Sequence, residues 1–480
     1  MRIFECRACL YKVKRNSLND NFRCPICGAS KEDMVLIENK YKNIKYIPLN
    51  HKNPGVVRVL SKCLNCGKCS DICKNYVGIN YDKSKTKFKV CVHCGQCIIN
   101  CPSGALIPRY NYKKVMDIIN KKDKIVIVST SPAVRVAIGE EFGLKAGEFC
   151  EGKMVAALKK LGFNYVFDTS FGADFTVIEE TCEFLDRIKK NENLPQFTSC
   201  CPSWVKYIEM YHPNLIKHLS TTKSPIAIQS TIIKEYFSKL INVKKEDIIT
   251  VALTPCTAKK YEINRSELKG LTDFVITTSE LALCLKENNI DFSSLNDEKY
   301  DSILGTSSGG GLIFGNSGGV TESILRALYK IICKDELPND FLHIKQIRGQ
   351  KGVKEVEAVI NGKNFKALVC QGLKNIEPFL LKLENNEKLK YDIIEVMNCP
   401  GGCIGGGGQP LSNISKLNEI RDKRIESLYN AEENKNIRCS VDNKEVLNIY
   451  NEFLDLPMSE KSHKYLHTSF KDKSKLLNNK

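Results

Sequence analysis

The chain contains 23 cysteines in 480 residues, and their grouping constrains the fold more than any other feature of the sequence. Secreted disulfide scaffolds are short chains, whereas this chain is long and rich in lysine. It begins MRIFECRACLYKVKR, with cysteines and charges where a signal peptide has its apolar segment. No stretch reaches the ~18 uninterrupted apolar residues of a membrane helix. We therefore expect a cytoplasmic protein whose clustered cysteines bind metal.

The first cysteine group consists of two C-x-x-C motifs, CRAC and CPIC, separated by fourteen residues. Two such motifs place four thiolates around one tetrahedral metal. FECRAC together with CPICG resembles a rubredoxin-type domain in the shortened form found in rubrerythrins. The redox setting favours iron over zinc, although the geometry allows both. The predicted ligands are Cys6, Cys9, Cys24 and Cys27.

The next two groups are C-x-x-C-x-x-C-x-x-x-C runs, the second followed by proline. This is the spacing of bacterial two-cluster ferredoxins, in which the fourth cysteine of each run ligates the other cluster. It predicts two [4Fe-4S] clusters. The expected ligands are Cys63, Cys66, Cys69 and Cys101 for one cluster, and Cys91, Cys94, Cys97 and Cys73 for the other. His93 lies between two ligands and is expected to be exposed.

From about residue 120, short apolar runs alternate with amphipathic segments. KIVIVSTSP, FNYVFDTSF, IITVALTPC and FVITTS are typical of buried strands, and GKMVAALKKL and PIAIQSTIIKEYFSKL are typical of helices. Strand–helix alternation predicts an α/β fold with largely parallel sheets. The end of the chain, SHKYLHTSFKDKSKLLNNK, is expected to fray.

Three further segments place cysteine directly beside proline or glycine in tight turns with apolar flanks. They are FTSCCPSW at 197–204, LTPCTAKKYE at 253–262 and EVMNCPGGCIGGGGQP at 395–410. Zinc sites usually take their ligands in local pairs. Thiols spread over several distant loops suit a buried iron–sulfur cubane instead.

These three segments resemble the three signature motifs of the iron-only, or [FeFe], hydrogenases, and the similarity extends from the ferredoxin-like region to the end of the chain. The resemblance implies an H-cluster, a [4Fe-4S] cubane joined through a cysteine thiolate to a two-iron unit with CO, cyanide and azadithiolate. The cubane ligands that it implies are Cys201, Cys256, Cys399 and Cys403, with Cys403 bridging to the two-iron unit.

The resemblance also implies the order of domains. We expect a rubredoxin-like single-metal domain over 1–40 and a 2[4Fe-4S] ferredoxin-type domain over 55–110. A large two-lobed α/β catalytic domain would follow over 120–412, and a small helical segment like the hydrogenase small subunit over 413–480.

Five residues match positions that contact the two-iron unit in the family. Lys259 matches a lysine that hydrogen-bonds an iron-bound cyanide, and Ser131 and Pro132 match a loop against the other cyanide. Met397 matches a thioether packed against the unit, and Phe314 an aromatic wall of the pocket. Without the resemblance, Lys259 reads as a surface lysine and Met397 as an ordinary core residue.

A chain of exchangeable protons is the second implication of the resemblance. Cys200 matches the proton donor beside the bridging amine, and Glu180, Ser220, Glu183 and Arg187 match the relay that leads to the surface. Such groups work within hydrogen-bond reach or through one water. The alternative for Glu183 and Arg187 is an i,i+4 ion pair on a solvated helix.

Three residues depart from the family pattern. Thr254 stands where the family usually has methionine, Asn398 where alanine is common, and Ile226 where a polar residue often follows Ser-Pro. Thr254 and Ile226 change the surroundings of the two-iron unit, so they put its potential, catalytic bias and oxygen sensitivity in doubt. Six cysteines have no partner motif and are expected to be small hydrophobic residues: Cys150, Cys182, Cys284, Cys333, Cys370 and Cys439.

The sequence thus predicts a ferredoxin-linked [FeFe] hydrogenase that interconverts protons and H2 and needs maturation enzymes. The formal charge of +17 falls to about +10 when cluster charges are included. The remaining basic surface suggests an acidic electron carrier as partner, with nucleic acid as the alternative. A lysine-rich composition with solvated faces explains the charge equally well, and no membrane partner is expected. A sensor with the same cluster and low turnover is the alternative. Two weaker ones are an iron–sulfur assembly relative without the two-iron unit, and peroxide or oxygen reduction at the rubredoxin-like region.

Overall fold

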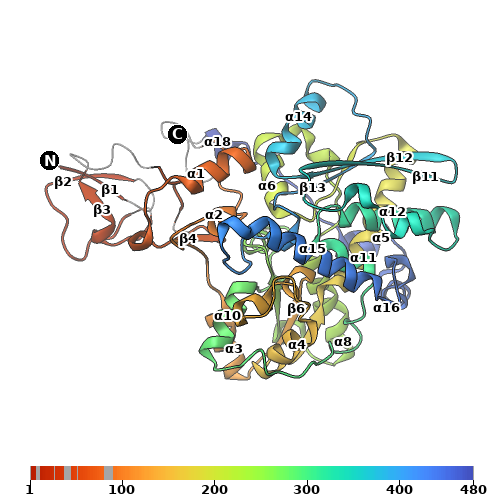
Figure 1. Cartoon of the computed structure of the whole chain (residues 1–480), viewed down its shortest axis with the longest axis horizontal. Coiled ribbons are helices and arrows are strands. Elements are labelled where there is room, and N and C mark those ends of the chain that lie inside the picture. The colour runs from red at the N-terminus through yellow and green to blue at the C-terminus, as the bar shows by residue number, and fades with distance from the viewer. Residues whose placement is uncertain are drawn as a thin grey trace.

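The computed structural model describes residues 2–6, 11–25, 27–36, 45–50, 52–80 and 90–478. A small antiparallel sheet lies at one end of the long axis in Figure 1, away from the two large lobes. Its strand order is β2-β1-β3, and its strands are β1 (Arg2–Cys6), β2 (Lys12–Arg15) and β3 (Met34–Leu36).

Residues 45–50, 52–80 and 90–110 follow and pack against the larger lobes (Figure 1). They include the predicted ferredoxin-type segment, and we call them the ferredoxin-like part. It contains a two-stranded antiparallel sheet and two short helices that carry cysteines. Each helix begins after a glycine with positive φ, Gly67 at 83° and Gly95 at 70°, where an L side chain is disfavoured. The elements are β4 (Val56–Arg58), β5 (Leu106–Pro108), α1 (Lys68–Ile72) and α2 (Gln96–Ile99).

The lower lobe in Figure 1 is built on a four-stranded parallel sheet of order β10-β9-β6-β7. Its strands are continuous apolar runs because helices cover both faces. The strands are β6 (Ile125–Thr130), β7 (Tyr165–Asp168), β9 (Ile248–Thr254) and β10 (Phe274–Thr277).

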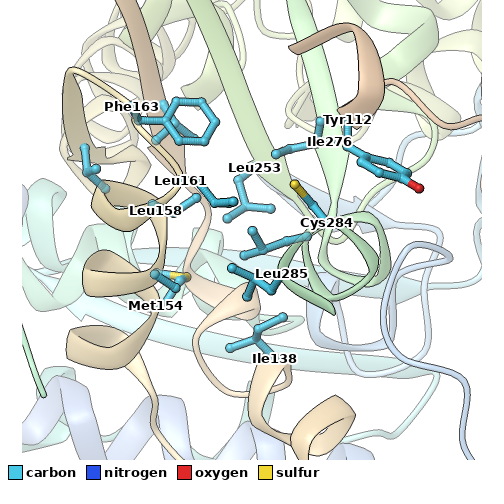
Figure 2. Packing of buried hydrophobic residues seen from close by; sticks show 14 of the residues in the cluster. Tyr112, Ile138, Met154, Leu158, Leu161, Phe163, Leu253, Ile276, Cys284 and Leu285 are labelled. Atoms are coloured by element: carbon cyan, nitrogen blue, oxygen red, sulfur yellow. The ribbon is translucent and has the colours of Figure 1, made fainter. Parts of the chain in front are cut away.

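One face of this sheet packs against three helices, α3 (Tyr112–Lys121), α4 (Glu151–Lys160) and α10 (Thr278–Glu287). Figure 2 shows this core, in which Leu253 and Ile276 from the strands meet leucine, methionine and phenylalanine side chains of the cover. Helix α10 starts with a capping box between Thr277 and Glu280, which fixes the end of β10 to the helix start.

The upper lobe contains a mixed sheet of order β11-β12-β13-β8, in which only the β11–β12 pair is antiparallel. Buried and exposed residues alternate along most of the edge strand β11, which is typical of a strand with one solvated face. The strands are β8 (Gln196–Phe197), β11 (Val353–Ile360), β12 (Lys363–Gln371) and β13 (Ile393–Met397). Helices α6 (Pro202–Tyr211) and α14 (Leu373–Glu384) pack on one face.

Helix α5 (Thr169–Lys190) joins the two lobes. It begins at Asp168, whose side chain accepts a hydrogen bond from the Ser170 N–H and caps the first turn. Phe171 and Phe175 pack toward the lower sheet, while Val177 and other residues of α5 pack toward the upper one. The functional residues of α5 are therefore held between two cores.

The remaining helices cover the lobes. They are α7 (Pro225–Ile232), α8 (Ser238–Leu240), α9 (Lys259–Glu262), α11 (Gly309–Leu312), α12 (Gly319–Cys333), α13 (Asn339–Leu342), α15 (Leu417–Glu433), α16 (Lys444–Ile449), α17 (Glu460–Leu466) and α18 (Lys475–Asn478). Within the described part of the chain, no helix is long and apolar enough to cross a membrane.

The expectation that the last nineteen residues fray is wrong for those that the structure describes. His467 is buried and forms a bridge with Thr222. The Lys471 N–H and the Lys473 Nζ both donate to the carboxylate of Glu209 on α6, at 3.0 and 2.6 Å. The tail is held because a buried glutamate in the upper lobe accepts its donors.

Candidate active site and metal sites

The carboxyl ends of the parallel strands in the two lobes face one another, which is where open α/β sheets place their ligands. A cavity lies between them. The loops after β6, β8, β9 and β13 supply much of its wall. Five predicted thiols from three distant segments line it together: Cys200, Cys201, Cys256, Cys399 and Cys403.

The electrostatics of these thiols fit a cationic metal cluster. Burial, followed by repulsion from Cys201, raises the pKa of Cys256 to about 11, and burial also raises the pKa of Cys201, Cys399 and Cys403. Four buried thiols this close become thiolates together only around bound positive charge. Backbone groups of Ala258 and Lys259 point toward the Cys256 sulfur and favour its charged form.

The glycine-rich loop after Cys399 allows backbones to approach closely. Gly402 has φ 97°, and a Cβ there would lie 2.4 Å from the Ser317 nitrogen. A Cβ on Gly407 would lie 2.4 Å from the Cα of Gly95, in the ferredoxin-like part. Only glycine permits these two contacts. The loop is thereby pressed against both the cavity wall and the Cys91–Cys97 segment.

The five residues predicted to contact the two-iron unit all line this cavity: Ser131, Pro132, Lys259, Phe314 and Met397. Lys259 is buried, so the surface-lysine alternative is wrong for this residue. Its Nζ donates to the Cys200 carbonyl oxygen at 3.0 Å and lies 2.8 Å from Glu262 Oε2. Although burial alone would lower it, Glu262 and Cys256 raise the pKa of Lys259, which keeps the ammonium charged.

The predicted proton relay forms a connected series along α5. Ser199 N–H donates to Glu180 Oε1 at 3.4 Å, and the Ser220 hydroxyl lies close enough to Glu180 to favour its charged form. Ser220 Oγ donates to Glu183 Oε2 at 2.8 Å, and Arg187 Nη2 donates to Glu183 Oε1 at 2.6 Å. The i,i+4 ion pair therefore exists, but both side chains are buried and not on a solvated face.

The two ferredoxin-type ligand sets occupy separate places. Cys63, Cys66, Cys69 and Cys101 line one small cavity. Cys73 lies with Cys91, Cys94 and Cys97, which add to the rise in its pKa after burial. We name the first set the outer site and the second the inner site. The fourth cysteine of each run thus lies with the other run.

Comparison with known proteins places these sites in a family. Residues 124–407, more than half of the chain, match the family model for the iron-only hydrogenase large subunit, C-terminal domain. Residues 418–473 match the iron hydrogenase small subunit. The chain belongs to the [FeFe] hydrogenase family.

Its relatives include two curated hydrogenases. The chain is 38% identical to iron hydrogenase 1 of Clostridium pasteurianum over 489 residues, covering 94% of this chain and 83% of the relative. It is 39% identical to the NADP-reducing hydrogenase subunit HndD of Solidesulfovibrio fructosivorans over 446 residues, covering 88% and 75%. It is also 30% identical over 470 residues to a probable cytosolic Fe-S cluster assembly factor, narfl, of Dictyostelium discoideum, covering 84% and 88%.

A solved relative gives the same fold. A variant of the apo [FeFe]-hydrogenase HydA1 from Chlamydomonas reinhardtii superimposes with a TM-score of 0.67 and 33% identity, covering 75% of this chain and 98% of that chain. The predicted α/β hydrogenase fold is confirmed.

The departures from the [FeFe] hydrogenase pattern all lie on the cavity wall: Ile226, Thr254 and Asn398. Asn398 is fully buried, and neither atom of its amide makes a hydrogen bond of good geometry with the described protein atoms. The amide lies near the inner-site thiol Cys94, where it opposes the rise to about 12 that burial causes in the pKa of that thiol. A buried amide without a hydrogen-bond partner suits a cavity wall that faces the sulfur atoms of a bound cluster.

Replacing Asn398 with alanine tests that interpretation. A buried amide without a partner costs about 1–3 kcal/mol, so we expect Asn398→Ala to raise the melting temperature of the iron-free protein. The gain should shrink in cluster-loaded protein, because cluster sulfur would accept the amide N–H. Asn375→Ala is the matched control: Asn375 Nδ2 already donates to the Gln371 carbonyl at 2.6 Å, so its loss should destabilise both forms. Equal effects of Asn398→Ala with and without iron would contradict the interpretation.

Protonation of the relay acid Glu180 has a definite direction. Burial, and then the charge of Glu183, raises the pKa of Glu180 from 4.5 to about 8. The folded protein therefore holds a proton that the unfolded chain releases above its lower pKa. The contribution of this proton to the free energy of unfolding is fully present below about pH 4.5, and it is lost as the pH rises toward 8.

We expect Glu180→Gln to remove this dependence. The melting temperatures of wild type and variant should be similar at pH 5, and the variant should melt several degrees higher at pH 8. Thermal unfolding of anaerobically purified protein at both pH values measures this. Parallel pH curves for the two proteins would contradict a proton held on Glu180.

The expectation that His93 is exposed is wrong. It is 6% exposed, with φ 61°, and stacks on Tyr261 with ring centroids 4.8 Å apart. Its Nδ1 lies 3.0 Å from Asn53 Oδ1 and its Nε2 2.8 Å from Lys206 Nζ. Burial and then the Lys206 charge lower the pKa of His93, so its ring is neutral. The inner site thus packs against the hydrogenase lobe and not against solvent.

Three predicted ligands of the rubredoxin-like site come together. The sulfurs of Cys6, Cys24 and Cys27 lie within 4.8 Å of one another, with Cys6 and Cys27 at 3.1 Å. Cys9, the fourth predicted ligand, lies outside the described residues. Of the six cysteines without a motif, Cys182 and Cys333 are partly exposed, and the others are buried as expected: Cys150, Cys284, Cys370 and Cys439.

Polar residues around the ferredoxin-type sites were missed in the sequence. Asn53 Nδ2 donates to Cys91 Sγ at 3.5 Å, and Lys206 Nζ donates to the Cys91 carbonyl at 2.7 Å. Arg58 donates to two outer-site sulfurs. Lys206 lies 115 positions from Cys91, and no local pattern links them. The only sequence signal for Asn53 and Arg58 is that each is a polar residue shortly before the first cysteine run.

Proposed function

We propose that the chain catalyses the reversible reduction of protons to H2, with electrons relayed through its N-terminal iron–sulfur sites. The observation that carries this is the convergence of five thiols and a buried lysine on one cavity between the lobes, with Glu180 close enough to Cys200 to raise the pKa of its thiol. We further propose a cytoplasmic location, because clustered cysteines in the proteins of reducing compartments usually serve as metal ligands.

The cavity residues suit an H-cluster. When bound, the cluster would supply the metal site at which protons and electrons combine. Cys201, Cys256, Cys399 and Cys403 would hold its cubane, and the Lys259 ammonium would hold an anionic ligand in a place where an unpaired charge is costly. Apolar walls that include Met397 and Phe314 exclude water from the same space.

Cys200 is placed to deliver protons. Burial, followed by the charge of Glu180, raises the pKa of Cys200, so its thiol keeps a proton at neutral pH. Glu180 is itself protonated there. Ser220 and Glu183 continue the series toward Arg187, whose Nη1 also donates to the His218 carbonyl at 2.9 Å. Hydrogen bonds join Ser220, Glu183 and Arg187, and Glu180 lies close enough to Cys200 to raise the pKa of its thiol. Proton exchange across the remaining steps would use a bridging water.

Electrons would enter through the ferredoxin-like part. Its inner site touches the catalytic loops directly: Gln96 Nε2 donates to the Gly405 carbonyl at 2.9 Å, and Thr257 Oγ1 donates to the His93 carbonyl at 2.6 Å. Two [4Fe-4S] clusters in the outer and inner sites would form a short path. A single iron in the rubredoxin-like site would extend it.

Spectroscopy of the matured protein tests the proposal. Protein produced anaerobically with hydrogenase maturation enzymes should show infrared bands of bound CO and cyanide and evolve H2 with a reduced ferredoxin-type carrier. Cubanes without those bands would point to an assembly-factor role, as the name of the narfl relative states for that protein. The bands with very low turnover would point to a sensor.

The surface around the outer site fits an acidic electron carrier. Between residues 52 and 80 the chain has five basic residues and one acidic residue. Cys66 is exposed, and Leu64 beside it is 69% exposed. Lys62 and Lys68 are exposed on either side. An apolar contact ringed by lysines is complementary to an acidic partner.

Charge reversal tests this surface. We expect Lys62→Glu with Lys68→Glu to raise KM for an acidic ferredoxin about tenfold at low salt, since rim charges act on association. The effect should fade near 0.15 M salt, where the Debye length is about 8 Å. Turnover with a small viologen dye should not change. Lys121→Glu with Lys122→Glu, an exposed pair at the end of α3, is the control. An equal KM effect in that pair would contradict a specific docking surface.

A further inference from the structure

Arg58, the last residue of β4, is in direct contact with the outer site. Its Nη1 donates to Cys63 Sγ and its Nη2 donates to Cys69 Sγ, each at 3.6 Å. Both sulfurs belong to the four that line the outer cavity, and Arg58 lines it as well. One guanidinium thus spans two thiols of the same predicted cluster.

The position of the guanidinium is fixed from two further sides. Nη2 also donates to the Ile47 carbonyl at 3.1 Å, and the group lies over the Tyr46 ring, 4.1 Å from its centroid. Its backbone pairs with Leu106 across the small sheet. Among the residues that the structure describes, the side-chain contacts of Arg58 are with two thiols, one carbonyl oxygen and one ring, and none is with a carboxylate.

The inner site has donors of a different kind. The Cys91 sulfur accepts from the Asn53 amide at 3.5 Å and from the His93 backbone N–H at 3.4 Å, and both donors are neutral. The Lys206 ammonium donates to the Cys91 carbonyl oxygen, and its charge also acts on Cys91. The two sites therefore differ in their donors to ligand sulfur: a guanidinium at the outer site, and an amide and a backbone N–H at Cys91 of the inner site.

We propose that Arg58 sets the reduction potential of the outer cluster by stabilising its reduced form. A one-electron reduced iron–sulfur carrier would pass one electron to this cluster, which gains one negative charge while the carrier is oxidised; no bond forms or breaks. Charge-assisted hydrogen bonds to ligand sulfur favour the more negative state. The inference rests on the proposed function, because it requires clusters in the outer and inner sites.

The consequence is an electron held near the docking surface. With Arg58 in place, the outer cluster accepts an electron more readily from a carrier bound at Leu64 and the neighbouring lysines. Loss of the cation would leave the outer cluster harder to reduce, while the inner cluster keeps its own donors.

A redox titration followed by electron paramagnetic resonance tests the inference on full-length protein reconstituted with iron and sulfide, without the two-iron unit. We expect Arg58→Gln to shift the reduction equilibrium of one ferredoxin-type cluster about tenfold toward the oxidised form, which is about 59 mV for one electron. Arg58→Lys, which keeps the charge, should shift it less. Arg109→Gln is the matched control, since Arg109 Nε donates to the Asn53 carbonyl.

The outcomes separate the two proposals. Wild-type protein that binds no pair of [4Fe-4S] clusters would refute the proposed electron path itself. Two clusters whose potentials are unchanged in Arg58→Gln, or an equal shift in Arg109→Gln, would refute only the role of Arg58. If Arg58→Gln fails to bind the outer cluster, Arg58→Met provides a neutral replacement of similar length for the same measurement. A shift in Arg58→Lys as large as that of the neutral variant would show that charge is not the cause.

Discussion

Replacement of Cys200 by alanine should lower the rate of H2 evolution by about 10²- to 10⁴-fold, the range expected when a positioned proton donor is lost. Cys200 lines the cavity beside Cys201, its thiol is protonated at neutral pH, and Glu180 lies close enough to influence its pKa. The infrared bands of CO and cyanide should remain, because the four other thiols would still hold the cubane. Rate measurements and infrared spectra of the same sample measure both effects.

Cys182→Ala is the control for Cys200→Ala. Cys182 lies on α5 among the relay residues but does not line the cavity, so its removal should change turnover by less than about twofold, as for a small apolar residue. Full activity of Cys200→Ala would remove this thiol from the relay. Loss of the infrared bands in Cys200→Ala would instead indicate that the thiol helps to hold the cluster.

Replacement of Glu180 by glutamine should lower turnover by at least about 10²-fold, because the amide keeps the shape but does not exchange a proton along the series. Glu180 lies between Cys200 and Ser220 and is fully buried, so bulk water does not bypass it easily. Cluster content measured by infrared and iron analysis should match wild type. The loss should persist at every pH from 6 to 9.

The neighbouring acid Glu179 offers a matched control for Glu180→Gln. It is also fully buried, but its oxygens accept from Tyr450 Oη at 2.6 Å and from the Met458 N–H at 2.9 Å, away from the cavity. Glu179→Gln should cost about 1–3 kcal/mol of stability through the altered hydrogen bonds while turnover stays within a few-fold. Equal loss of turnover in both variants would mean that a buried acid on α5 matters for folding and not for proton transfer.

The sequence was sufficient for the fold and for the thiols of the large domain because both leave local marks. Apolar runs such as KIVIVSTSP form strands of a parallel sheet, and cysteine beside proline or glycine marks the turns that follow those strands. Helical spacing placed Glu180, Glu183 and Arg187 on one side of α5, where the structure finds them in contact with Ser220 or with one another.

Other features were out of reach because they depend on which parts of the chain pack together. His93 is buried only because Tyr261 and Lys206 of the catalytic part cover it. The tail is held by contacts with distant parts of the chain, among them Glu209 and Thr222. No short-range sequence pattern predicts either set of contacts. Taken alone, each segment is therefore expected to be exposed to solvent.

The contact between Gly95 and Gly407 limits how this molecule can be rebuilt. Grafting another redox module onto the catalytic part would succeed only if the donor module also presents bare backbone at that point, because a single methyl group on either side would meet main-chain or side-chain atoms at 2.4–2.5 Å. A linker that only holds the new module near the catalytic part would not reproduce this close backbone contact. The close packing of the ferredoxin-like part on the catalytic part depends on the absence of two side chains.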